Sequence, residues 1–221
     1  MSKKFKGVLL FAVLASLVGL VLSVCPTRSM AEEADGRTVT VVVSDLDSSS
    51  AVQQVNELLS DPSITTLNVI DASLVARNRV SGDSAINPIW DVPTDLRNLT
   101  YLGNVTGSTR IASAKGYPGM NLEISCTKEV SNEYSCSVSL DSHLVSGCVG
   151  FDVSDTESVS VSGSADVPYY YNGRRVASMT LNAYTLYENY SYDVYQYNSY
   201  VATGYARRAS GCTFSRTYSY A

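Results

Sequence analysis

Eight tyrosines lie between residues 184 and 205, and they are the side chains best suited to bind a ligand. Tyrosine offers a large, rigid contact area with a polar tip, and with neighbouring serine and asparagine it makes an adaptable recognition surface. Residues two apart in a strand share a face, so several of these rings would lie together. The candidate binding residues are Tyr190, Tyr192, Tyr195, Tyr197 and Tyr200. The alternative is structural, because tyrosine favours strands and cross-strand aromatic pairs stabilise sheets by up to about 1 kcal/mol.

Side chains that commonly carry catalysis or hold metals are sparse. The single histidine, His143, follows Asp141 and Ser142, but consecutive strand residues point to opposite faces and do not converge into a nucleophilic relay. The acidic residues at 45–47 and 152–157 lack the spacing of a calcium-binding loop. We therefore expect no metal and no cofactor, and we favour a non-enzymatic role. A glycan-acting hydrolase stays as an alternative, because its two Asp or Glu side chains can lie far apart in the sequence.

Four cysteines follow the N-terminal segment, and an even number in an exported chain predicts two disulfides. The segment 121–140 resembles a hairpin that turns near residue 131, which would place Cys126 opposite Cys136 at a distance that a disulfide can close. Cys148 would then pair with Cys212. The cysteine spacing matches no zinc-binding pattern.

The N-terminal segment indicates export. Three lysines precede the apolar run 7–24, and Ser29-Met30-Ala31 has the small residues of a cleavage site, so residues 1–31 are predicted to be a signal peptide. Two alternatives stay open. The run approaches the roughly 20 residues of a membrane span and would serve as an uncleaved anchor. Residues 22–25 resemble a bacterial lipobox, in which Cys25 would carry a lipid. Each alternative places the body outside the cell, with the membrane reached only through this segment.

Composition narrows the classes of partner. The chain has 221 residues, is 45% hydrophobic and 17% charged, and carries a net charge of −5. The hydrophobic fraction is ordinary for a globular protein and excludes wholesale disorder. The acidic balance argues against a nucleic-acid partner, whose phosphates require clustered Lys and Arg. An extracellular glycan or protein is the expected ligand.

The N-terminal half, residues 32–120, combines a strand–helix–strand unit with loops. The stretches 38–44 and 64–70 are rich in β-branched residues, and an amphipathic pattern at 50–60, capped by Ser50, predicts a helix that ends before Pro62. This unit predicts a parallel strand pair connected by a helical crossover. Residues 72–120 are predicted to be loops with short strands at 99–102 and 109–112, and Ile89 and Trp90 are expected to anchor them on the core.

The C-terminal half, residues 121–221, is predicted to form strands throughout. Apolar and polar residues alternate with a period of two, and Asn172-Gly173 has the sequence of a hairpin turn. Short strands are predicted around 184–187, 190–197, 199–207 and 212–220. The fold class is mainly β (α+β): an antiparallel β-sandwich or barrel-like C-terminal region with one N-terminal amphipathic helix.

These observations together predict an exported, disulfide-stabilised binding module, secreted or attached to the cell surface. It would recognise a glycan or protein, as an adhesin does, through a β face rich in Tyr, Asn and Ser. A secreted toxin or inhibitor is a further alternative beside the hydrolase.

Overall fold

The chain is built mainly from β-strands. The computed structural model describes residues 36–77 and 93–221, of which 65% lie in strands and 15% in helices. This confirms the mainly β prediction, although the described strands do not close into a barrel. The predicted signal peptide at 1–31, the possible lipid site at Cys25, and Ile89 and Trp90 lie outside the described residues.

The N-terminal unit is the strand–helix–strand arrangement that the sequence predicts. β1 (Arg37–Val43) and β2 (Ile64–Asp71) pair in parallel, and α1 (Ser49–Ser60) connects them. The hydroxyl of Ser48, rather than that of the predicted Ser50, caps the helix by accepting a hydrogen bond from a backbone N–H of the first turn. The buried side chains of α1 are Ala51, Val55 and Leu59.

The main sheet has seven strands, three of which are long. These are β3 (Thr94–Gly116), β8 (Arg174–Gln196) and β9 (Ser199–Tyr220). The order is β1-β2-β9-β8-β3, with β5 (Glu133–Ser135) beside β9 and β7 (Tyr170–Tyr171) beside β8. The short strands predicted for these regions are therefore wrong in length, because they merge into continuous strands with irregular register. The sheet is mixed, since only β1 and β2 run parallel.

Two tight turns connect strands of this sheet. β8 and β9 form one long hairpin that turns at Tyr197 and Asn198, whose φ angles are 50° and 63°. Asn172 and Gly173, with φ angles of 50° and 74°, form the turn between β7 and β8, which confirms the hairpin predicted there. Positive φ at both central residues matches the right-handed twist of the flanking strands.

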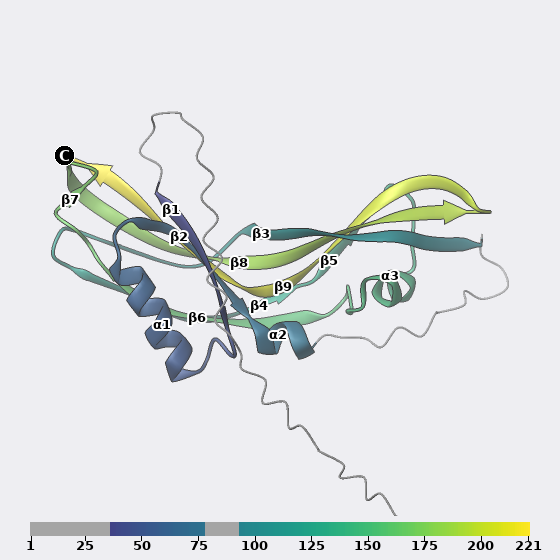
Figure 1. Ribbon diagram of the computed structural model, residues 1–221, viewed down its shortest axis with the longest axis horizontal. Helices are drawn as coiled ribbons and strands as arrows, with labels where there is room; N and C mark the ends of the chain where they lie inside the picture. The colour runs from purple at the N-terminus through teal and green to yellow at the C-terminus, as the bar shows by residue number, and fades with distance from the viewer. Residues whose placement is uncertain (1–35, 78–92) are drawn as a thin grey trace, which may run out of the picture.

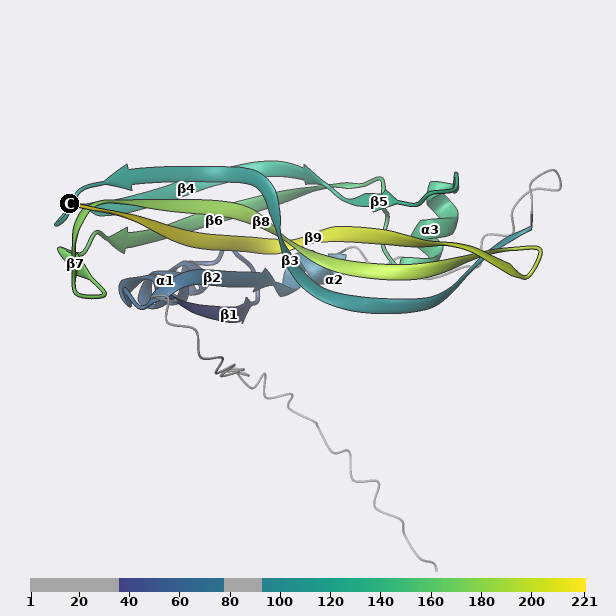
Figure 2. The same cartoon turned by 90° about the horizontal axis from the view of Figure 1, so that it is seen from above.

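A second layer covers one side of the main sheet. It contains the antiparallel pair β4 (Asn121–Ser131) and β6 (Thr156–Asp166), together with α1, α2 (Ala72–Arg77) and α3 (Ser142–Val149). Figure 1 shows all three helices on the same side of the sheet, and Figure 2 shows the long strands from above. None of the helices in residues 36–77 and 93–221 is long and apolar enough to cross a membrane.

Two hydrophobic clusters lie between the layers. The larger one joins α1, β1, β2, β4 and β6 to the N-terminal half of β8 and the C-terminal half of β9. The smaller one packs Val145 and Val149 of α3 and the following Phe151 against Tyr192 and Val194 of β8. The small cluster fixes which face of the β8–β9 hairpin is covered.

Helix α3 departs from the prediction of strands throughout the C-terminal half. Asp141 caps it by accepting a hydrogen bond from the backbone N–H of His143 at 2.7 Å, and the chain leaves it through Gly150 at a φ of 78°. Both are standard signals for helix ends. His143 is exposed on the first turn.

The predicted disulfides Cys126–Cys136 and Cys148–Cys212 are wrong. Segment 121–140 does not fold into a hairpin, because β4 pairs with β6 and places Cys126 opposite Val161. Cys148 lies against the small cluster, whereas Cys212 is fully buried in the large one. All four are free cysteines, and no described pair lies at disulfide distance.

Candidate binding face

One face of the β3–β8–β9–β5 region is turned away from the helices, and we call it the open face. Paired residues of neighbouring strands share a face, so the register determines its members. The open face carries Arg97, Glu133, Ser135, Asn189, Ser191, Asp193, Tyr195, Tyr200, Thr203, Tyr205 and Arg207. Three of these eleven residues are Tyr, two are Ser and one is Asn, while four are charged.

The predicted binding tyrosines are divided between the two faces. Tyr195 and Tyr200 lie on the open face, and their ring centroids are 5.9 Å apart in an edge-to-face arrangement. Tyr197 lies in the hairpin turn and is 71% exposed. Tyr190 and Tyr192 point to the covered face, where Tyr192 is only 1% exposed. The strand period thus determines which tyrosines lie together, but not which group faces solvent.

The part of the open face next to the hairpin turn is held by an aromatic and polar cluster. The Arg97 guanidinium lies 4.5 Å above the ring centre of Tyr195. The Tyr200 and Thr203 hydroxyls are 3.0 Å apart, and Thr203 donates to the Asp193 carboxylate at 3.0 Å. These contacts orient two tyrosine rings on a rigid strand pair, as recognition surfaces require.

A small cavity lies further along the open face, where β5 joins β9. Its volume is about 210 Å³, and its lining consists of Glu133, Tyr134, Ser135, Asn189, Tyr205, Ala206 and Arg207. Register explains the grouping, because Arg207 pairs with Glu133 on one side and Asn189 on the other. In the next row Tyr205 lies between Ser135 and Ser191.

The charged groups of the cavity are already oriented. Arg207 Nη2 lies 2.7 Å from Glu133 Oε2, and the guanidinium lies 4.7 Å from the ring centre of Tyr187. Tyr187 lies beside it, in the neighbouring row of the same face of β8 and β9, and its burial raises the pKa of the Tyr187 phenol. Tyr205 stays 49% exposed, so its ring is free to contact a ligand. Asn189 and Tyr205 belong to the tyrosine-rich segment 184–205 that the sequence singles out, whereas Glu133 comes from a distant segment and meets Arg207 only because β5 pairs with β9.

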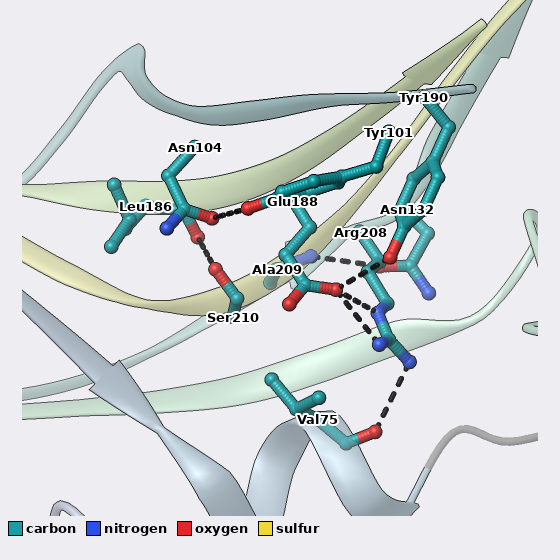
Figure 3. A network of polar contacts seen from close by, with 10 residues as sticks. All are labelled: Val75, Tyr101, Asn104, Asn132, Leu186, Glu188, Tyr190, Arg208, Ala209 and Ser210. Atoms are coloured by element: carbon teal, nitrogen blue, oxygen red, sulfur yellow. Dashed lines mark hydrogen bonds and ion pairs between the residues drawn. The ribbon is translucent and has the colours of Figure 1, made fainter. Parts of the chain in front are cut away.

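Behind the open face, a buried ion pair connects the sheet to α2 (Figure 3). Arg208 contacts one Glu188 oxygen through Nε and Nη2, each at 2.8 Å, and donates to the Val75 carbonyl at 3.1 Å. The Tyr190 hydroxyl donates to the same carboxylate at 3.0 Å. Burial, and then the nearby Glu188 charge, raise the pKa of Tyr190 to about 12. We assign this network to rigidity rather than to ligand contact, because its ionic side chains are buried.

The open face combines exposed aromatic rings with charged and amide side chains. Among the residues lining the cavity, Glu133 is the single carboxylate, and it is engaged by Arg207. A glycosidase needs two carboxyl groups on either side of the scissile bond. Within residues 36–77 and 93–221, no three His, Cys, Asp or Glu side chains gather as metal ligands.

The chain matches no protein-family model, and no curated protein resembles it significantly. The proposed function therefore depends on the arrangement of the side chains on the open face.

Proposed function

We propose that the protein is an exported, non-enzymatic binding module, of the adhesin type, that recognises a glycan through the open face. One observation carries the proposal: exposed tyrosine rings lie beside paired charges and an amide on the uncovered side of a rigid sheet. Aromatic rings stack on the apolar faces of sugars, and planar polar side chains bond their hydroxyls. The apolar N-terminal run at 7–24, preceded by lysines, supports export.

A binding role is favoured over hydrolysis by the state of the acidic groups. Glu133 is paired with Arg207, and Asp193 accepts hydrogen bonds from Asn98 and Thr203. Carboxylates held in this way orient a surface, whereas a general acid needs free access to the leaving group.

A glycan array tests the proposal with protein purified from cells that express the full chain. We expect binding to a restricted set of glycans, and at least a tenfold loss in the triple variant Tyr195→Ala, Tyr200→Ala and Tyr205→Ala, because aromatic anchors dominate such surfaces. The control is Tyr117→Ala with Tyr170→Ala, since these tyrosines are 64% and 66% exposed but lie away from the open face. An empty array, or binding that the triple variant retains, would refute the proposal.

A further inference from the structure

The cavity on the open face limits the size of what it takes. Its volume of about 210 Å³ is below the roughly 300–1,000 Å³ of a pocket for a drug-sized ligand. One six-membered ring is a suitable occupant, while the rest of a longer ligand would extend over the exposed strands. The Tyr205 ring, 49% exposed, provides a flat wall on which such a ring stacks.

The charges of the cavity balance each other. Glu133 and Arg207 form a pair at 2.7 Å, with side chains 52% and 35% exposed. An anionic ligand would be attracted by Arg207 and repelled by Glu133, and a cationic ligand would meet the reverse. A neutral ligand meets neither penalty, and the net charge of −5 further disfavours anions.

The hydrogen-bonding groups of the cavity include both donors and acceptors. A guanidinium has five N–H donors, and the structure shows that Glu133 engages one of those of Arg207. The second carboxylate oxygen of Glu133 stays available as an acceptor. None of the described residues hydrogen-bonds the side-chain amide of Asn189, which offers both a donor and an acceptor. Vicinal hydroxyls of a sugar are both donors and acceptors and match this set.

We propose, on the basis of the function proposed above, that this cavity is a subsite for one neutral pyranose ring of the glycan. The ring stacks on Tyr205, its hydroxyls accept from Arg207 and donate to Glu133, and Asn189 bonds a neighbouring hydroxyl. The Tyr187 ring, in the neighbouring row of the same face, stacks against the guanidinium and holds it in place. The subsite selects uncharged sugars, because Glu133 repels an anionic sugar and Arg207 repels a cationic one.

Ligand-detected NMR titration of the full chain tests this subsite. The probes are the methyl glycosides of glucose, galactose and mannose, with glucuronic acid and glucosamine as their charged counterparts. We expect one or more neutral glycosides to bind with a Kd of about 1 mM, as suits a ligand of this size. The charged sugars should bind about tenfold more weakly, and Tyr205→Ala should weaken neutral binding by about tenfold. Tyr170→Ala is the control.

Charge variants separate recognition from a merely structural role. Glu133→Gln leaves Arg207 uncompensated and should shift the preference to glucuronic acid, while Arg207→Gln should shift it to glucosamine. An unchanged preference in both variants, or a wild-type preference for a charged sugar, would overturn the subsite and leave the proposed function standing if the array still shows binding through the open face. Absence of binding on the array and in the titration would overturn both.

Discussion

Tyr192 of β8 lies directly opposite Gly204 of β9, and its ring occupies the space that a side chain at position 204 would need. The glycine therefore lets a fully buried tyrosine lie flat against the neighbouring strand. Ala202 and Ala206, which flank Gly204 on the same face, continue this row of small residues and belong to the small cluster. Packing of this kind sets both the covered face and, by alternation, the open one.

Gly204→Ala should destabilise the protein by about 1–3 kcal/mol, the usual cost of overpacking a core. Urea denaturation of the wild type and the variant measures this loss. Combining the change with Tyr192→Leu should recover part of it, because the clash needs both groups, and the double-mutant cycle should give a coupling of about 1 kcal/mol or more. Strictly additive effects would contradict the contact.

Tyr192→Phe should leave stability unchanged or raise it by up to about 1 kcal/mol. The Tyr192 hydroxyl is buried and has no hydrogen-bond partner among the described residues. Removing it therefore removes a desolvated group without breaking a bond. Tyr190→Phe is the matched comparison, since its hydroxyl donates to Glu188, and it should cost about 1–2 kcal/mol. A loss in Tyr192→Phe as large as that in Tyr190→Phe would disprove this difference.

The two neighbouring arginines of β9 should differ sharply when each is replaced by methionine. Arg208→Met leaves the buried Glu188 carboxylate without its ion-pair partner and should cost about 3–5 kcal/mol of stability. Arg207→Met breaks the exposed pair with Glu133 and should cost at most about 1 kcal/mol. The side chains of the first pair are 7% and 14% exposed, against 35% and 52% in the second. Equal losses of stability for the two variants in thermal or urea unfolding would contradict the interpretation that the Arg208–Glu188 pair stabilises the fold and the Arg207–Glu133 pair does not.

Stability should fall in alkaline solution as buried tyrosines ionise. An exposed tyrosine has a pKa of about 10, whereas burial raises the pKa of Tyr190 to about 12 and also raises those of Tyr187, Tyr192 and Tyr218. A phenol that holds its proton more tightly when folded stabilises the protein below pH of about 10, and this contribution is lost as the pH rises through about 12.

Urea unfolding at a series of pH values, followed by circular dichroism, measures this alkaline loss. In Tyr190→Phe the slope of stability against pH should be shallower between about 10 and 12, because one proton fewer is linked to unfolding. Tyr170→Phe, at a 66% exposed position, should keep the wild-type slope. Identical slopes in all three proteins would show that Tyr190 does not titrate differently on folding.

The local parts of the fold could be predicted from the sequence, whereas the strand partners could not. The β1–α1–β2 unit and the Asn172-Gly173 turn depend on neighbouring residues, and both are confirmed. Apolar and polar residues alternate along β4, and this pattern fits either a hairpin with the following residues or a pairing with β6. The alternation period alone does not distinguish these partners. The predicted Cys126–Cys136 disulfide was wrong because it depended on that hairpin.

The candidate site shows the same division. Tyr195 and Tyr200 could be predicted as part of a tyrosine face because they are close in sequence. The cavity needs Glu133 beside Arg207, which are far apart in the chain and meet only because β5 pairs with β9. The covered face of β8 is set by α3, a short helix rich in residues that favour strands or turns, so the burial of Tyr192 was not evident.

Arg216 interrupts the apolar side of β9, and the structure explains its position. The side chain is buried, donates to the Asp61 carbonyl at 2.7 Å and also to the Leu59 carbonyl, and so satisfies the C-terminal end of α1. Arg216→Met should therefore cost about 1–3 kcal/mol by leaving these carbonyls unpaired. Arg216→Lys keeps the charge but not the forked geometry, and should recover only part of the loss.

Urea unfolding measures these losses, and hydrogen exchange should locate them in the last turn of α1. Arg175→Met, at an exposed position on β8, is the control and should stay within about 0.5 kcal/mol of the wild type. Wild-type stability and wild-type exchange in Arg216→Met would mean that α1 is held by its apolar side chains alone. Since α1 packs against β6 through Leu59 and Gly163, exchange of the β6 amides should rise together with that of the helix if the contact matters.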